Sequence, residues 1–376
     1  MRLTTLSTIL VLLLIGCGDS SPGSGTAGSG GSAGAGGSGG TDEFTATLSH
    51  TYDPIMVDVN EEVVDICQTW VLDNDEPIYV RKVRQTNDGG WHHSNWFFLP
   101  ERSYQPGPAE GPDATIEGTW NCDDRAFSEY FAAALGGVFF AQSTQTLQEV
   151  QAFPEGAALE IPARSAIVGS VHLLNVFAKA LPTSMTFDVE TVPADDVAVR
   201  LTPYSFAIGD LKIPPAVDGV PTETRTAMTC DLRETFQQRL QQDVVDYNIY
   251  YVLGHYHEWG NYFNLSFVHD DGTRETVFEI KNRIGEPIGS IIDPPMNNNG
   301  ASMLRSECGF INNTDEELTR GLQYGEMCDF LAYTDANLAI GAGGGSNDGI
   351  PDDEVDGVPV HELDCGGITS FKVYHD

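Results

Sequence analysis

The sequence has few basic residues. Its 376 residues include 19 Lys and Arg against 55 Asp and Glu, which gives a formal net charge of −36 and a pI near 4.3. A surface this acidic repels nucleic acid and anionic lipid. The composition therefore argues against nucleic acid as a partner and fits a soluble body in an extracytoplasmic space.

The sequence also lacks an apolar run long enough to span a bilayer as a mature helix. Ile9 to Ile15 is too short to cross as a mature helix, and it follows Arg2, as in an export signal. The run leads into Gly16-Cys17, which resembles the bacterial lipoprotein signal, in which the cysteine is lipidated. We expect residues 1–17 to be this signal, with lipid on Cys17. The alternative is an ordinary signal peptide with a stray cysteine.

The next stretch lacks every large side chain. Ser21 to Gly40 contains only Ser, Pro, Gly, Thr and Ala, so it cannot bury a core and is typical of a flexible coil. We expect residues 18–43 to be a tether that holds a folded body away from a membrane. The expected location is the cell envelope, with the protein lipid-anchored in the outer membrane or exposed at the cell surface, and no other membrane contact.

The sequence from residue 44 onward is mostly β in pattern. Residues 166–174 form an apolar run typical of a buried strand, and residues 185–192 alternate strictly, as in a half-buried strand. Helical spacing is limited to residues 126–135 and 234–246, and residues 101–125 indicate a long loop. With a boundary near Pro193, the pattern predicts an all-β fold of two tandem jelly-roll-like sandwiches, residues 44–193 and 194–376.

Seven cysteines are present. If Cys17 carries lipid, an even number remains, which suggests three disulfides in an exported chain. Six cysteines allow 15 pairings, and spacing does not choose among them.

The chain contains a His-x-His motif, His255 and His257, after an aromatic and β-branched run from Tyr247 to Leu253. That run predicts a strand, on which residues i and i+2 share a face. Two imidazoles aimed at one point can chelate copper, zinc or iron. The alternative is a pair of exposed or hydrogen-bonded histidines near a strand end.

The first half offers His92 and His93 in sequence, and His172 within an apolar strand. Neighbours on a regular strand face opposite ways, so a shared metal requires a twist or bulge at His92-His93. Together the three could form a zinc or copper site, although a lone histidine such as His172 is commonly a core residue. Met327 is the candidate third ligand for His255 and His257, because thioether selects Cu(I); its alternative role is core packing.

In order and approximate spacing, these six residues resemble the ligands of the copper type II, ascorbate-dependent monooxygenases, the family of peptidylglycine α-hydroxylating monooxygenase and dopamine β-monooxygenase. The matching motifs are His92-His93, Val171-His172, His255-Tyr256-His257 and Glu326-Met327-Cys328. The resemblance spans roughly residues 55–365. It implies two jelly-roll-like sandwiches, each holding one copper.

The resemblance also implies a chemistry. Ascorbate or a similar reductant would bring both coppers to Cu(I), and O2 would bind at the His255, His257 and Met327 copper. That copper would take hydrogen from a C–H bond of a small organic or peptide-like substrate, and the other copper would supply an electron. It further implies the disulfides Cys67–Cys122 and Cys308–Cys328, so that Cys230 and Cys365 remain for a third.

The chain departs from the family at four positions. Ser94 stands where the family usually has methionine after the histidine pair. Leu253, Leu331 and Ser170 replace an arginine, a tyrosine and a glutamine; the arginine and the tyrosine bind peptide in the peptide-amidating members. The ligands are retained, but recognition of a C-terminal glycine is not expected.

Residues 347–357 crowd carboxylates around glycines, which is typical of calcium loops, but they do not match EF-hand spacing. Calcium is a possible ligand there, and a solvated acidic loop is the alternative. For the whole chain, the alternatives to an enzyme are a non-catalytic copper-binding protein and a metal-free jelly-roll binding module. The sequence does not indicate the substrate or the oligomeric state.

Overall fold

The structure is a computed structural model that describes residues 44–104, 116–142, 145–281, 289–321, 325–346 and 349–372. The predicted signal with Cys17 and the predicted tether at 18–43 lie outside the described residues. The part from Glu43 to Asp376 forms one compact unit. None of its described helices is long and apolar enough to cross a membrane.

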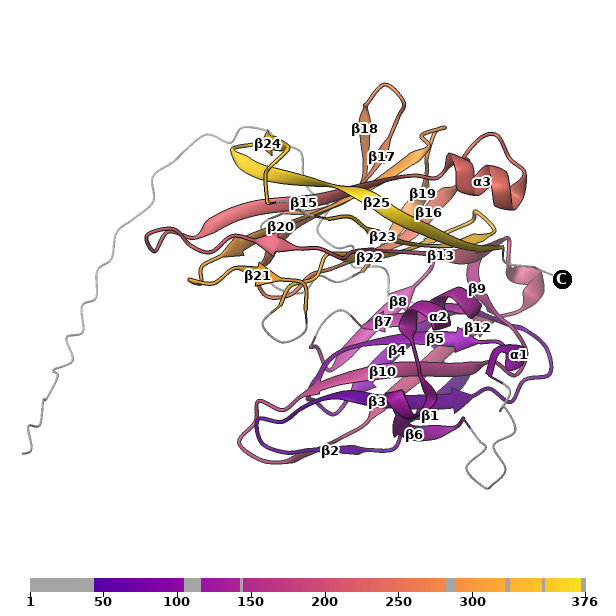
Figure 1. The fold of residues 1–376 in the computed structure, drawn as a ribbon. Coiled ribbons are helices and arrows are strands. Elements are labelled where there is room, and N and C mark those ends of the chain that lie inside the picture. The colour runs from indigo at the N-terminus through magenta and orange to yellow at the C-terminus, as the bar shows by residue number, and fades with distance from the viewer. Residues whose placement is uncertain are drawn as a thin grey trace, which may run out of the picture. The chain divides into compact units, whose positions relative to one another are not determined.

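The all-β, jelly-roll-like class is confirmed, and Figure 1 follows the strands in chain order. The first sandwich pairs a sheet of order β6-β3-β10-β5-β7 with the strands β1, β12, β4, β8 and β9. Its strands are β1 Leu48–Thr51, β2 Ile55–Val57, β3 Glu62–Val71, β4 Ile78–Asn87, β5 Trp91–Leu99, β6 Gly118–Asn121, β7 Gly137–Gln142, β8 Gln148–Ala152, β9 Ala157–Ile161, β10 Ala166–Leu174, β11 Leu181–Thr183 and β12 Met185–Val192.

The second sandwich pairs strands β16, β19, β22, β13 and β23 with the series β15-β20-β17-β18. The long strand β25 joins both layers, because it pairs with β23 and also with β15. Its strands are β13 Val199–Ile208, β14 Lys212–Ile213, β15 Thr222–Asp231, β16 Asn248–His255, β17 Gly260–Val268, β18 Arg274–Lys281, β19 Ser290–Asn297, β20 Met303–Asn312, β21 Leu318–Thr319, β22 Asp329–Thr334, β23 Leu338–Gly344, β24 Asp353–Val355 and β25 Val358–Lys372.

The helices are short and depart from the prediction. Helix α2 spans Glu129–Leu135, three residues inside the expected start, and α3 spans Arg233–Leu240. Helix α3 ends early because Gln241 adopts a left-handed φ of 58°. The predicted loop over 101–125 is partly wrong: α1 Glu101–Tyr104, β6 and a 3-10 turn at Cys122–Arg125 lie within it, and residues 105–115 lie outside the described residues.

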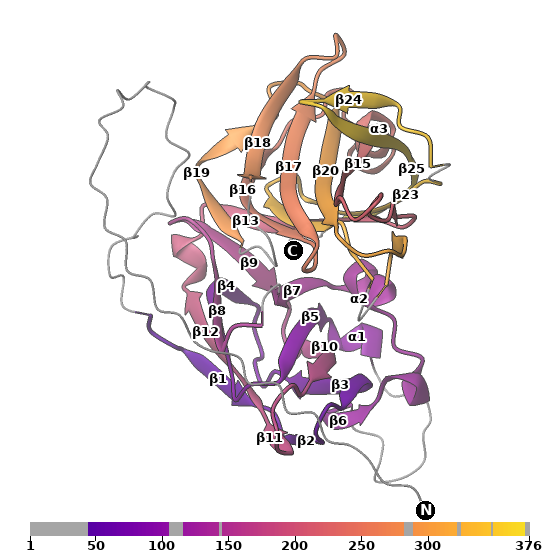
Figure 2. The same ribbon diagram turned by 90° about the vertical axis from the view of Figure 1, so that its left-hand side faces the viewer.

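The predicted strands at 166–174 and 185–192 match β10 and β12 residue for residue. Strand β10 lies between β3 and β5 in its sheet (Figure 2), and its side chains are buried along nearly all its length. Strand β13 runs unbroken through Pro203, although proline cannot donate to a ladder and normally interrupts a strand. Pro203 is opposite Tyr333 of β22, and the ladder continues on both sides of it.

One hydrophobic cluster crosses the expected boundary at Pro193. Tyr251, Leu253, Leu331 and Tyr333 of the second sandwich are buried in the same cluster as the aromatic core of the first. The Tyr333 hydroxyl donates to the Val138 carbonyl at 3.0 Å, so a buried polar group also bridges the two. The domain division stays a prediction, but the two sandwiches share packing.

The three expected disulfides are confirmed: Cys67–Cys122, Cys230–Cys365 and Cys308–Cys328. The first joins β3 to the turn that comes after β6. The second joins β15 to β25, and the third joins β20 to the segment that carries Met327.

Candidate metal centre

A bulge in β5 brings the three first-sandwich histidines together. His93 is paired with His172 of β10, but the next pair is Trp91 with Leu173, so His92 is one residue in excess on β5. The surplus residue breaks the alternation that would otherwise send His92 and His93 to opposite faces. A metal shared by His92 and His93 requires a twist or bulge at this point, and the structure has a bulge there.

The three side chains are close enough to share a metal. One ring nitrogen from each of His92, His93 and His172 lies within 4.8 Å of the others, and all three rings are buried. His172 is 3.0 Å from His93 Nε2 through its Nδ1, and its Nε2 is 2.7 Å from Glu62 Oε1. A carboxylate on the far nitrogen orients a ligating imidazole and fixes its tautomer.

His255 and His257 also come together, but not by strand alternation. Strand β16 ends at His255, and His257 lies in the turn after it, with its ring centroid 5.2 Å from that of His255. The turn needs Gly260, because a Cβ there would stand 2.0 Å from the Tyr256 ring. His257 Nδ1 donates to the Gly325 carbonyl at 2.9 Å, which leaves its Nε2 as the free nitrogen.

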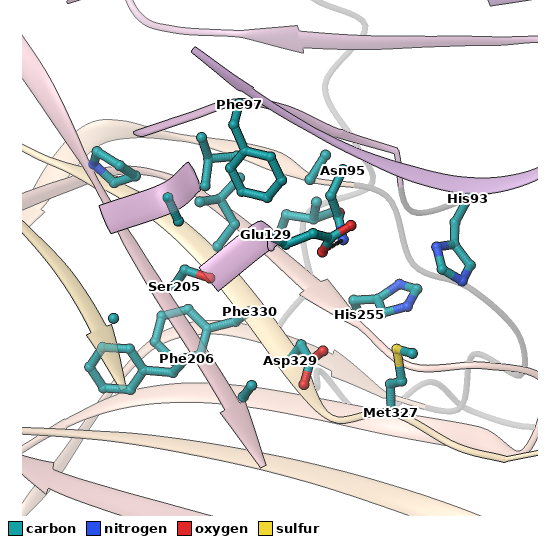
Figure 3. A pocket seen from close by; sticks show the side chains of 18 of the residues that line it. His93, Asn95, Phe97, Glu129, Ser205, Phe206, His255, Met327, Asp329 and Phe330 are labelled. Carbon is teal, nitrogen blue, oxygen red and sulfur yellow. Dashed lines mark hydrogen bonds between the residues drawn. The ribbon is translucent and has the colours of Figure 1, made fainter. Parts of the chain in front are cut away.

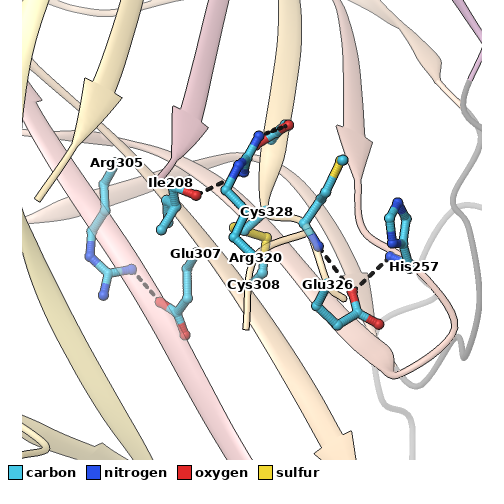
Figure 4. Close-up of a disulfide and its surroundings, with 10 residues drawn as sticks. Ile208, His257, Arg305, Glu307, Cys308, Arg320, Glu326 and Cys328 are labelled. Atoms are coloured by element: carbon cyan, nitrogen blue, oxygen red, sulfur yellow. Dashed lines mark hydrogen bonds and ion pairs between the residues drawn. A yellow bond between two sulfur atoms is a disulfide. The ribbon is translucent and has the colours of Figure 1, made fainter. Parts of the chain in front are cut away.

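Glu326 ties this turn to the segment that carries Met327. Its carboxylate accepts backbone N–H groups from His257 at 2.8 Å, Trp259 at 2.7 Å and Met327 at 3.3 Å. Burial raises the pKa of Glu326 to about 7, against the lowering effect of those donors. Figure 4 shows Glu326 between His257 and the Cys308–Cys328 disulfide. The hydrogen bonds from His257 and Trp259 to Glu326, and the disulfide at Cys328, hold the segment that carries Met327 in place.

All five histidines form one cluster. The ring centroid of His93 lies 5.5 Å from that of His255 and 5.8 Å from that of His257, and His92 lies 5.9 Å from His257. The two expected ligand sets therefore adjoin each other across the two sandwiches.

Burial of the imidazoles favours their neutral form, which is the form that binds metal. Burial, followed by the neighbouring His172 and His257, lowers the pKa of His92 to about 4. Burial likewise lowers the pKa of His172 and His257, and lowers that of His93 and His255 further. Two buried ring nitrogens, His92 Nδ1 and His257 Nε2, have no hydrogen-bond partner. Unpaired buried acceptors are costly, and a bound metal would satisfy them.

A cavity of about 570 Å³ opens beside the cluster. His93, His255 and Met327 line it, and Figure 3 shows these three on one side of the view, with Phe206 on the other. Most of the wall is apolar. Leu253, Leu331 and Ser170, which stand where the resembled family has an arginine, a tyrosine and a glutamine, all line this cavity.

All six predicted ligands thus lie at one place, and Met327 lines the cavity beside His255. Sequence reasoning missed Glu62, Glu129 and Asn95, because each lies on an element whose place in the fold the motifs do not give.

Within the described ranges, the only group of three or more His, Cys, Asp or Glu side chains close enough to share a metal is His92, His93 and His172. The calcium hypothesis remains untested, since Asn347 and Asp348 lie outside those ranges.

Comparison with known proteins leaves the family open. No protein-family model matches the chain, and no curated protein matches it. Among solved structures, the exported protein XepA of PBSX matches at 6% identity and TM-score 0.20, covering 77% of this chain and 86% of its own. The major capsid protein P2 of bacteriophage PM2 matches at 6% identity and TM-score 0.26, covering 77% and 97%. A secreted protein of Parabacteroides distasonis matches at 9% identity and TM-score 0.19, covering 77% and 88%.

Proposed function

We propose that this protein is a copper-dependent monooxygenase that hydroxylates a C–H bond of a small organic substrate with O2 and an ascorbate-like reductant. The observation that supports it is the position of the cluster. Three of the five clustered imidazoles, those of His93, His172 and His255, line an apolar cavity together with the Met327 thioether, and the cavity is large enough for a substrate.

The donor set fits copper on chemical grounds. Imidazole suits either oxidation state, and a thioether favours Cu(I) over zinc or magnesium. Bound copper would supply O2 activation and electron transfer. His92, His93 and His172 would hold one ion, and His255, His257 and Met327 a second.

The chain's own residues would do the rest. Glu62 orients His172, the Gly325 carbonyl orients His257, and Glu326 holds the backbone beside Met327. The apolar walls would exclude water from the reacting C–H bond and hold it next to His255 and Met327.

The test combines copper analysis with turnover. We expect two coppers per chain, one sulfur scatterer in the X-ray absorption spectrum of the reduced protein, and ascorbate-dependent O2 uptake that a substrate stimulates. Met327→His should keep copper bound, remove the sulfur scatterer and slow O2 uptake, because it replaces a soft ligand with a harder one. His255→Ala should lose one copper and abolish turnover without unfolding the chain.

Three results would overturn the proposal that the protein is an enzyme. Copper bound with the expected sulfur but without substrate-stimulated O2 uptake would favour a copper-binding protein that does not turn over. Equal copper in wild type and His255→Ala would refute the second copper site, and no copper in either protein would favour a metal-free binding module.

We also propose that the protein is anchored to the cell envelope through lipid on Cys17. The predicted signal that ends at Cys17 supports the anchor, and the disulfides support an extracytoplasmic body. Cys17→Ser should move the protein from the membrane fraction to the soluble fraction; a mutant that stays membrane-bound would refute the lipid anchor.

A further inference from the structure

The cavity beside the histidines has one polar feature that the ligand set does not use. Glu129, at the start of α2, projects among apolar residues of both sandwiches (Figure 3). The same cavity wall includes Phe97, Val138, Phe206, Phe330 and Ile340.

Glu129 is held by two neutral donors. Asn95 Nδ2 donates to Oε2 at 3.0 Å, and the Ser170 hydroxyl donates to Oε1. A carboxylate can accept about four hydrogen bonds, so these two leave capacity unused. The partners fix the direction of the group without neutralising it. Burial raises the pKa of Glu129, with Ser170 and Asn95 opposing the rise.

The cation that lines the cavity is already engaged. Arg320 donates to both carboxylate oxygens of Asp329, at 2.7 and 2.8 Å, and to the Ile208 carbonyl at 2.8 Å. Asp329 therefore cancels its charge. Among the described residues of the cavity wall, Glu129 is left without a cationic partner, so the cavity carries a net negative charge when Glu129 is ionised.

Resting on the proposed function, we propose that the cavity takes an apolar molecule with a single N–H or O–H donating head. The head would bind Glu129, and the apolar body would fill the space between Phe97 and Phe330 and reach toward His255 and Met327. A molecule ending in a carboxylate would place two negative charges together in an enclosed space, and no free cation among the described wall residues would offset them.

The experiment measures binding to the metal-free full chain, so it does not depend on turnover. The probes are octylamine, octanol and octanoate, which share one apolar chain and differ in the head, and calorimetry gives each Kd. We expect octylamine and octanol to bind and octanoate to bind at least about tenfold more weakly.

The matched variants are Glu129→Gln and, as a control, the exposed Glu155→Gln. Glu129→Gln keeps the shape of the side chain and removes its charge. It should therefore weaken the binding of octylamine about tenfold and bring the Kd of octanoate closer to the Kd values of the other two probes. Glu155→Gln should change none of the three. If octanol also binds Glu129→Gln more weakly than wild type, Glu129 recognises the head as a hydrogen-bond donor. If only octylamine binds more weakly, Glu129 recognises the head as a cation.

Octanoate binding as tightly as octylamine, or octylamine unaffected by Glu129→Gln, would overturn the proposal. Failure of the enzyme is separable from this result. Wild type that binds the probes but takes up no O2 with copper and ascorbate would refute the monooxygenase and leave the ligand class standing.

Discussion

At the residue scale, Glu326 carries more of the site than its position in sequence suggests. It is buried, and its two oxygens accept three backbone N–H groups on either side of the metal ligands. In a glutamine at this position, an NH2 group would replace one carboxylate oxygen and would face backbone N–H groups, which are also donors. The effect would fall on the placement of His257 and Met327 rather than on the ligands themselves.

We predict that Glu326→Gln weakens the second copper by about tenfold to a hundredfold, the usual cost of losing an outer-sphere partner. Copper titration of the reduced protein measures the affinity, and X-ray absorption reports the sulfur. Glu155→Gln, an exposed change in the turn between β8 and β9, is the control and should leave both the copper affinity and the sulfur signal unchanged. Equal affinities in the two variants would remove the positioning role of Glu326.

The buried histidines also predict how the metal-free protein responds to acid. The pKa of each is lower in the fold than its ordinary value of 6.5, so the unfolded chain binds more protons as the pH falls. Their contribution is full above the unfolded pKa and is lost as the pH falls toward about 4, the pKa of His92. For His92 alone the loss is on the order of 2–3 kcal/mol.

Urea unfolding of the metal-free protein at about pH 7.5 and about pH 5 measures this loss. His92→Gln cannot take up the proton, so the free energy of unfolding should fall less between the two pH values in that variant. An equal fall in wild type and variant would show that His92 does not contribute.

At the element scale, the Cys308–Cys328 disulfide connects β20 to the ligand Met327. We predict that changing both cysteines to serine lowers the free energy of unfolding by about 2–4 kcal/mol and also disturbs the sulfur scatterer of the reduced copper protein. The Cys230–Cys365 pair, changed in the same way, should cost comparable stability and leave the scatterer intact. Loss of sulfur in both or in neither would show that the bond does not position Met327.

The elements that could be predicted are those with a strong period or a strong motif. Strands β10 and β12 follow from apolar and alternating runs, and the bulge at His92 is what a metal shared by two adjacent histidines would require. The turn at His257 does not follow from local sequence, because backbone bonds to Glu326 create it. Strand β13 continues through Pro203 for a similar reason: pairing with β22 overrides a local signal.

The polar group of the cavity, Glu129 with its partner Asn95, is the part of the site that sequence does not reach. Glu129, Asn95 and Ser170 lie on α2, β5 and β10, and only the packing of these elements brings them together. No period or spacing links them, and none belongs to a motif with its own chemistry.

At the scale of the whole molecule, the shared core predicts joint unfolding. Tyr333 packs on Phe153 with ring centroids 4.8 Å apart and donates to Val138, so the second sandwich completes the core of the first. We predict one cooperative transition by calorimetry and near-UV circular dichroism. Tyr333→Leu should lower its midpoint without splitting it. Two separate transitions in wild type would show that the sandwiches are independent.

The bulge in β5 has a consequence for how this site tolerates change over time. Substitutions at His92 or His93 alter a ligand but keep the chain length on which both positions depend. A deletion of one residue between Trp91 and Ser94 would restore a regular ladder with β10, and only one side chain could then face His172. The site is therefore encoded partly as a length, and a single lost codon would remove a ligand even where the residue left behind was histidine.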